Sequence, residues 1–171
     1  LVRSRGLGDV YKRQEHDVLI LADDIYGRLV YNGNEFTPIS SLSEAIRKQT
    51  VVINGVSKSY SMTGWRIGYA VGEPEIIAAM SKVAGQTTSN PTTVAQYAAI
   101  EALTGSQETV EIMRQAFEER LNTIYPLLAQ VPGFEVIKPQ GAFYLFPNVK
   151  KAMEMKGFTD VTAFTLSLIH I

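Results

Sequence analysis

The chain has 171 residues, a length that suggests about one domain, and an ordinary globular composition with 46% hydrophobic and 19% charged residues. Its formal net charge of −1 argues against a nucleic-acid or acidic-membrane partner, because either would leave a basic footprint. Without cysteine and with only two histidines, it offers no disulfide framework and no zinc cluster, and no apolar run reaches the length of a membrane span. We therefore expect a soluble cytoplasmic protein without a nucleic-acid or membrane partner.

The two ends of the chain have the character of adapter sequence. Ser4 to Gln14 resembles the translation of a sequencing-library adapter. When Asp9 to Gln14 is written as GAT-GTG-TAT-AAG-AGA-CAG, its reverse complement translates as L-S-L-I-H-I, which are residues Leu166 to Ile171. An insert flanked by inverted adapters has reverse-complementary ends, whereas the two ends of a natural gene have no reason to be reverse complements. We therefore interpret residues 1–14 and 166–171 as adapter sequence and expect residues 15–165 to be an internal piece of a longer protein.

The first native element is the apolar run Val18 to Ala22, which is typical of a parallel strand covered on both faces. Asp23 and Asp24 follow it directly. They are expected at the carboxyl edge of a sheet, where ligands of open α/β sheets bind. For Asp24 we prefer the simpler interpretation that its side chain caps the next turn.

Turn signals and periodicity predict the order of the remaining elements. Helix and strand patterns alternate up to the break at Thr104-Gly105-Ser106, and beyond it apolar residues at spacings of three and four predict one long helix, which Pro126 should kink or end early. The predicted elements are a turn at Asn32-Gly33, helices over 41–48 (N-cap Ser41 or Ser43), 73–85, 92–103 and 107–131, strands over 50–53, 67–71, 134–137 and 142–146, and a final helix from Thr159.

A lysine in a short loop is the most informative single residue. The strand Val51 to Ile53 ends in an Asn-Gly turn signal, Lys58 comes just after it, and Arg66 follows in a glycine-punctuated segment. A lysine that acts covalently condenses with a carbonyl, and pyridoxal phosphate is a cofactor that uses this chemistry. The cofactor would then need a carboxylate for its ring nitrogen, a donor for its ring hydroxyl and a cation for its phosphate. Asp23, Tyr26 and Arg66 are of the right types.

Four motifs in this order resemble the aspartate-aminotransferase-like, fold-type-I pyridoxal-phosphate enzymes of aminotransferase class I/II, and most closely the bacterial aspartate aminotransferases. They are D-D-I-Y at 23–26, N-G-V-S-K-S-Y-S-M-T-G-W-R-I-G-Y at 54–69, T-S-N-P at 88–91 and P-Q-G-A-F-Y at 139–144. The resemblance covers residues 15 to about 165.

The resemblance implies a role for each matching residue. Lys58 would form the Schiff base with pyridoxal 5'-phosphate and move a proton during catalysis, and Asp23 would pair with the pyridine nitrogen. Tyr26 would contact the ring hydroxyl and Arg66 the phosphate. Many relatives have a phosphate-binding serine three residues before the lysine, where this chain has Gly55. Whether the main chain, Ser57 or a lost segment replaces that contact stays open. Asn90 and Phe143 are compatible with either a pocket or interface role or simple packing.

The resemblance also implies an α/β fold class: a partial pyridoxal-phosphate-dependent transferase fold with the C-terminal part of a large, mostly parallel-sheet domain over 15–105. A linking helix and the start of a small α+β domain would occupy 106–165. The expected parent is a homodimeric aminotransferase of amino-acid metabolism that transfers nitrogen from aspartate to 2-oxoglutarate. Other substrates, including aromatic amino acids, remain open, as does a ligand-sensing domain of a transcription regulator. We expect residues 15–165 alone to be inactive and to bind cofactor poorly.

Overall fold

The computed structural model describes Lys12 and residues 18–169 of the chain, so the predicted adapter stretch 1–14 lies outside the described residues except for Lys12. The chain divides into two compact units. The first ends at Arg28 and resumes over Glu35–Glu111, and the second consists of Leu29–Asn34 and the chain from Ile112 onward. None of the described helices is both long enough and apolar enough to cross a membrane.

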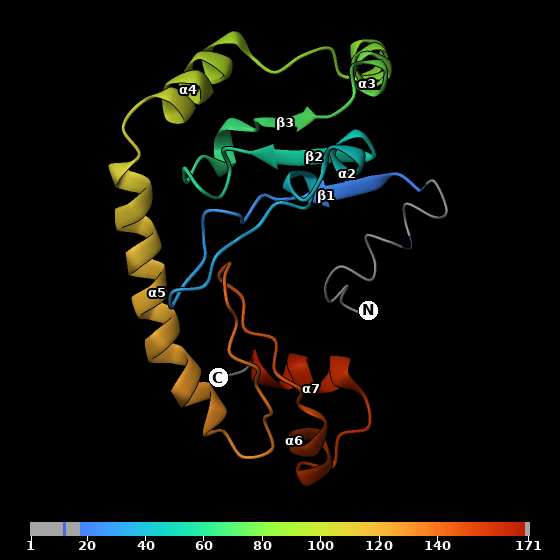
Figure 1. Ribbon diagram of the computed structural model, residues 1–171. Helices are drawn as coiled ribbons and strands as arrows, with labels where there is room; N and C mark the ends of the chain where they lie inside the picture. Colours follow the sequence, from blue (N-terminus) through green and yellow to red (C-terminus); the bar gives the residue numbers. More distant parts are fainter. Residues whose placement is uncertain (1–11, 13–17, 170–171) are drawn as a thin grey trace. The chain divides into compact units, whose positions relative to one another are not determined.

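A three-stranded sheet of order β1-β2-β3 is the centre of the first unit (Figure 1). Strands β1 (Ile20–Asp23), β2 (Thr50–Gly55) and β3 (Gly68–Val71) confirm the three strands predicted for this part of the sequence. β1 pairs with β2 in parallel, and β2 pairs with β3 antiparallel so that Gly55 lies opposite Gly68. The end of β1, the end of β2 and the beginning of β3 therefore meet at one edge of the sheet.

Short helical segments cover one face of β1. These are η1 (Ile39–Ser41) and α2 (Glu44–Lys48), and Ile46 of α2 packs against Ile20 with only 1% of its surface exposed. The expectation that Val18 to Ala22 is covered on both faces is wrong for the described residues, because Leu21 is 73% exposed. Successive side chains of a strand point to opposite faces, and here the described helices cover only the face that carries Ile20.

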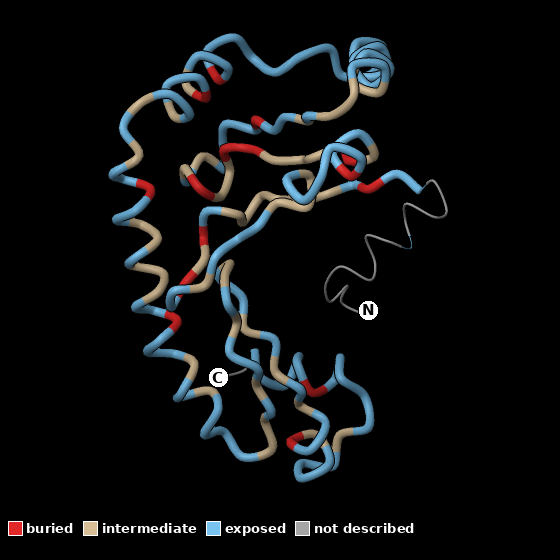
Figure 2. The backbone as a smooth tube through the Cα atoms, viewed as in Figure 1, coloured by how far each residue is buried: buried red, intermediate tan, exposed pale blue. Residues whose placement is uncertain are grey.

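A second apolar cluster lies beneath helix α4 (Thr93–Thr104). Ala95 and Ala99 pack against Val56 and Ile67, which flank the lysine loop and the short segment η2 (Thr63–Trp65). The small alanine side chains allow this close approach, as the sequence suggests. By contrast, helix α3 (Pro74–Thr87) has an apolar stripe but contains no buried residue, and Val83 is 64% exposed. In Figure 2 the buried residues of this unit accordingly lie away from α3.

The second unit contains most of helix α5 (Glu108–Ala129) together with α6 (Lys150–Met155) and α7 (Val161–Leu168). α5 includes Pro126 and continues to Ala129, so the proline does not end it early. The predicted turn at Asn32-Gly33 is present, since both residues are left-handed and the Asn34 amide donates to the Tyr31 carbonyl oxygen at 3.2 Å. The side chains of α5 hold this turn, because the Glu118 carboxylate accepts from the Asn32 amide at 3.2 Å.

The two strands predicted over 134–137 and 142–146 do not form. Only isolated bridges occur in this region, between Val30 and Gly141 and between Glu135 and Asn148. Ala142 has a φ of 58°, which interrupts the second predicted strand at its first residue.

Ser43 is the N-cap of α2, and its hydroxyl accepts from the Ile46 amide at 3.2 Å. We predict that Ser43→Ala lowers the free energy of unfolding by about 1 kcal/mol, because a helix N–H next to the buried Ile46 side chain loses its partner. Urea unfolding checks this. Ser81→Ala, at an exposed position inside α3, is the matched control and should be neutral or slightly stabilising. Equal losses in the two variants would show that the cap contributes nothing.

Candidate functional site

The D-D-I-Y segment leaves the sheet at the edge where the three strand ends meet. Asp23 is the last residue of β1, and its Oδ1 accepts weakly from the Ile25 amide at 3.4 Å. The Gly27 amide donates to the Asp24 carbonyl oxygen at 2.9 Å, and this bond closes a tight turn that contains Tyr26. It is thus the carboxylate of Asp23, and not that of Asp24 as expected, that accepts a hydrogen bond from the turn.

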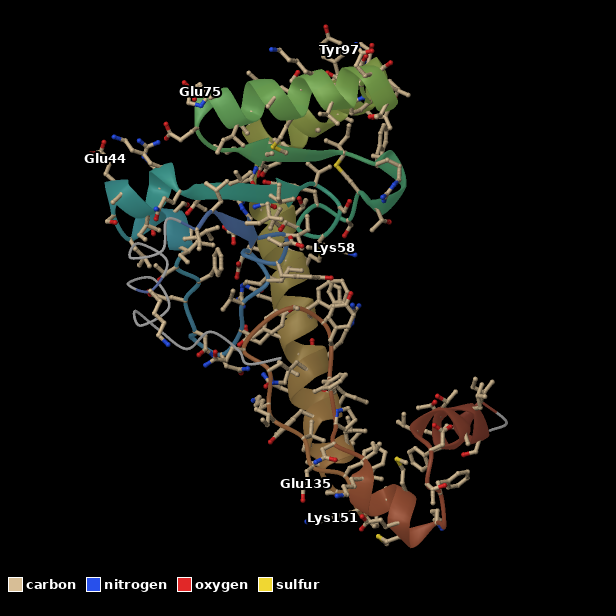
Figure 3. All side chains as sticks on the ribbon, turned by 90° about the vertical axis from the view of Figure 1, so that its right-hand side faces the viewer. Glu44, Lys58, Glu75, Tyr97, Glu135 and Lys151 are labelled. Carbon is tan, nitrogen blue, oxygen red and sulfur yellow. The ribbon has the colours of Figure 1, made fainter. Side chains whose placement is uncertain are left out.

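Lys58 lies in the loop after β2, as Figure 3 shows. The loop is a compact turn, because the Tyr60 and Met62 amides both donate to the Val56 carbonyl oxygen, at 3.3 and 3.4 Å. The Nζ of Lys58 is 5.9 Å from the centroid of the Tyr26 ring, within the range of a cation–π interaction. Two of the residues proposed from the sequence are therefore brought together in space, although 32 positions separate them in the chain (58 minus 26).

Arg66 lies at the same sheet edge, because it comes two residues before β3 begins there at Gly68. Its Nη1 donates to the Thr63 carbonyl oxygen at 2.8 Å, and its exposed guanidinium lines a hollow of about 580 Å³ together with Asn90, Pro91 and other residues of the α3–α4 loop. Lys58 does not line this hollow. The structure thus brings Arg66 and Asn90 to one hollow, and Lys58 and Tyr26 to each other.

Left-handed backbone conformations occur in the loops around these residues. Ser61, Arg66 and Ser89 have φ angles of 54°, 56° and 62°. Each costs about 1 kcal/mol for a residue with a side chain, so the surrounding structure must impose it. Such strain is concentrated at ligand-binding sites in proteins, and here it lies in the loops that carry Lys58, the guanidinium of Arg66 and Asn90.

Gly55 has no room for a side chain. A Cβ atom at this position would lie 2.8 Å from the Ile67 carbonyl oxygen and 3.1 Å from the Gly68 Cα. Both contacts are with backbone atoms that hold β2 and β3 together, so a serine would push the strands apart. This gives a physical reason for the glycine at the position where many related enzymes have a serine.

Asp24 is the carboxyl at this edge whose pKa is altered. Partial burial raises the pKa of its carboxyl above the ordinary value, and repulsion from the neighbouring Asp23 carboxylate raises it further. Burial therefore disfavours charge on Asp24, while the exposed Asp23 is the carboxylate that is accessible to a cationic partner.

A polar cluster that the sequence did not reveal lies next to the site. The side chains of Arg28 and Tyr60 both donate to the Oε1 of Gln107, at 2.6 and 3.0 Å. Arg28 comes two residues after Tyr26, and Tyr60 comes two residues after Lys58. The only sequence signal was a glutamine directly after the Thr-Gly-Ser break, and this signal does not indicate which loops it joins.

Pyridoxal phosphate fits the donor set at this sheet edge. The exposed Asp23 carboxylate suits the ring nitrogen, and the Tyr26 phenol suits the ring hydroxyl. The Lys58 amine beside that phenol suits the aldehyde, and the exposed Arg66 guanidinium suits the phosphate. The β1-β2-β3 pairing places all of them at the ends of neighbouring strands, where open α/β sheets bind ligands.

Comparison with known proteins identifies the family. The sequence profile of aminotransferase class I and II matches residues 7–169. The chain therefore belongs to the class I and II aminotransferases, a family whose members use pyridoxal phosphate, act on amino acids and oxo acids, and are often dimers.

Individual relatives agree with this membership. The chain is 70% identical to the asparagine–oxo-acid transaminase of Streptococcus mutans, over 98% of this chain and 45% of that protein. It is 53% identical to the aspartate aminotransferase of Bacillus sp. strain YM-2, over 97% of this chain and 45% of that one. The crystal structure of the aspartate aminotransferase of Rhizobium meliloti superposes with a TM-score of 0.80 at 37% identity, over 83% of this chain and 36% of that one. The chain thus spans less than half the length of these relatives.

We predict that Gly55→Ser lowers the free energy of unfolding by about 1–3 kcal/mol, because the new Cβ would contact the backbone of Ile67. Chemical denaturation measures the loss. Gly85→Ser is the matched control, since a Cβ at Gly85 would have no atom within 4 Å and serine is the better helix former. A Gly55→Ser variant as stable as the parent chain would show that β2 and β3 can separate freely.

We predict that Asp24→Asn raises the free energy of unfolding slightly at neutral pH, because it removes a partly buried charge beside Asp23; solvent screening of the exposed part of the carboxyl keeps the gain small. A raised pKa in the folded state means that the protonated carboxyl is favoured there, so the parent chain loses this contribution as pH rises through that pKa. The advantage of the variant should therefore fade as pH falls below the ordinary carboxyl pKa. Glu35→Gln, at an exposed loop position, is the control, and an advantage independent of pH would contradict the prediction.

Proposed function

We propose that this chain carries the cofactor-binding lysine region of a pyridoxal-phosphate-dependent aminotransferase, with Lys58 as the catalytic residue. The observation that carries the proposal is the approach of the Lys58 amine to the Tyr26 ring, 5.9 Å from its centroid, at the sheet edge where β1 ends in Asp23. The approach is supported by the turn around Lys58, which the Tyr60 and Met62 amides close by donating to the Val56 carbonyl oxygen.

The residues at the edge have complementary tasks in this proposal. The Asp23 carboxylate would accept a hydrogen bond from the protonated ring nitrogen and so keep that nitrogen protonated. The Tyr26 hydroxyl would donate a hydrogen bond to the ring oxygen. Arg66 would bind the phosphate through its planar pair of N–H donors, while its other side is held by the Thr63 carbonyl. When bound, pyridoxal phosphate supplies an electron sink that allows the Cα–H bond of an amino acid to ionise. The Nζ of Lys58, in its neutral form, would take that proton and return it.

The proposed reaction moves the amino group of aspartate, or of its amide asparagine, to a 2-oxo acid, with 2-oxoglutarate as the expected acceptor. The names of the relatives from Streptococcus mutans and Bacillus support this choice of donors. An aromatic amino acid is the second candidate donor, because the aromatic aminotransferase of Pyrococcus horikoshii superposes with a TM-score of 0.77 at 33% identity, covering 81% of this chain and 37% of that one. We further propose that the full enzyme is a homodimer, as family members often are.

Lysine trapping tests the assignment of Lys58. We predict that borohydride reduction in excess pyridoxal phosphate attaches the cofactor to Lys58 in a hybrid enzyme in which residues 15–165 replace the matching segment of the Streptococcus mutans relative. Lys58→Ala should abolish this labelling, because the attachment needs the amine beside Tyr26. Peptide mass spectrometry locates the added mass. Lys82→Ala, which removes an exposed lysine of α3, is the control and should leave the pattern unchanged.

The reaction itself is measured in a hybrid enzyme, because the chain spans 45% of the Streptococcus mutans relative and we expect it to be inactive by itself. Residues 15–165 replace the matching segment of that relative, and aspartate, asparagine and phenylalanine are compared as donors. Transamination should require Lys58, with a loss of several orders of magnitude in Lys58→Ala. A hybrid whose turnover survives Lys58→Ala would overturn the assignment.

A further inference from the structure

Gln107 lies between the two loops that carry Tyr26 and Lys58. Its Oε1 accepts from the Nη1 of Arg28 at 2.6 Å and from the hydroxyl of Tyr60 at 3.0 Å. Its Nε2 donates to the carbonyl oxygens of Ala102 and Gly105, at 3.0 and 2.8 Å. One amide therefore makes four hydrogen bonds, and these join the end of α4 to both loops.

The orientation of this amide is determined by its neighbours. Arg28 can only donate, so the atom facing it must be the oxygen. The two backbone carbonyls at the end of α4 can only accept, so the atom facing them must be the nitrogen. Rotating the amide by 180° would break three of its four hydrogen bonds, which leaves one arrangement and makes Gln107 a rigid bridge.

On the lysine side, the bridge ends on Tyr60. The Tyr60 ring packs against the cluster of Val56, Ile67, Ala95 and Ala99, and its hydroxyl is held by Gln107. Both Tyr60 and Met62 close the turn by donating to the Val56 carbonyl oxygen. Lys58 lies inside that turn, so the position of the Tyr60 side chain limits where the lysine backbone can be.

On the other side, the bridge ends on Arg28, which follows the turn of Tyr26 closed by the bond from Gly27 to Asp24. The Arg28 guanidinium also lies over the Tyr60 ring, with its Cζ 5.8 Å from the centroid. Arg28 and Tyr60 thus contact each other as well as Gln107. Arg28, Tyr60 and Gln107 thus link the two loops. Arg28 follows Tyr26 by two residues, Tyr60 follows Lys58 by two residues, and Gln107 bonds to both.

We propose that Gln107 is a positioning residue that sets the spacing between the Lys58 amine and the Tyr26 ring by joining the Tyr60 hydroxyl to the Arg28 guanidinium. The functional meaning of that spacing rests on the role proposed above for Lys58. The alternative is that Gln107 only caps the end of α4 through its Nε2, and that its contacts to Tyr60 and Arg28 have no effect on the lysine.

Two substitutions separate these alternatives. Tyr60→Phe removes the hydroxyl at the bridge and keeps the cap on the Ala102 and Gly105 carbonyls. Gln107→Glu does the reverse, because a carboxylate still accepts from Arg28 and Tyr60 but has no N–H to donate to the two carbonyls. Gln107→Leu removes both functions.

The readout is the acetylation of Lys58 by acetic anhydride in the full chain without cofactor, measured by mass spectrometry from neutral to alkaline pH. The exposed Lys82 of α3 is the internal reference. Tyr60→Phe and Gln107→Leu should raise the Lys58-to-Lys82 ratio about fivefold, the change that follows from losing one net hydrogen bond that holds the turn closed. Gln107→Glu should keep the parental ratio and pH profile although it lowers thermal stability. Tyr97→Phe, at an exposed tyrosine of α4 that Figure 3 labels, is the matched control.

An unchanged ratio in Tyr60→Phe overturns the proposal. So does a ratio that rises in Gln107→Glu in step with its loss of stability, because a cap alone would produce that result. The double variant Tyr60→Phe with Gln107→Leu should exceed neither single variant, since both remove the same link. The labelling needs neither cofactor nor turnover, so its outcome is independent of the borohydride experiment, and failure of one does not imply failure of the other.

Discussion

The pairing of β2 with both of its neighbours is the constraint on which the site depends. β2 runs parallel to β1 and antiparallel to β3, so the chain leaves β1 at Asp23, leaves β2 at Gly55 and enters β3 at Gly68 along one edge. The antiparallel pair is closed at that edge by two facing glycines, and a Cβ on Gly55 would contact the backbone of Ile67 at 2.8 Å. Close approach of the backbones thus fixes where the lysine loop begins.

The loops that leave this edge are held by contacts outside the regular elements. Ala95 and Ala99 of α4 pack against Val56, and the side-chain amide of Gln107, just before α5, donates to the Ala102 and Gly105 carbonyl oxygens at the end of α4. These contacts support left-handed backbone at Ser61, which would be unfavourable in an isolated loop. Under our proposal, contacts with α4 and Gln107 help to set the geometry of the lysine–tyrosine contact and so pre-organise the site before a ligand binds.

The carboxylates at the edge illustrate how one sequence motif provides two environments. Asp23 lies exposed at the end of β1 with a weak bond to the Ile25 amide, whereas burial and the charge of Asp23 raise the pKa of Asp24. Adjacent like charges favour the protonation of one partner, and burial selects Asp24 as that partner. The burial of Asp24 leaves the exposed Asp23 as the carboxylate that suits the role toward the cofactor ring nitrogen that we propose for it.

The sequence by itself determined the strands β1 to β3, the helices other than α6, the Asn32-Gly33 turn and the family, because hydrophobic periodicity, turn chemistry and short motifs are local properties. It could not determine contacts between distant segments. The exposure of Leu21, the absence of the two strands predicted over 134–137 and 142–146, the crowding at Gly55 and the bridge through Gln107 all depend on which surfaces meet in space. Periodicity identifies an apolar face but not whether another element covers it, and only the tertiary structure decided that.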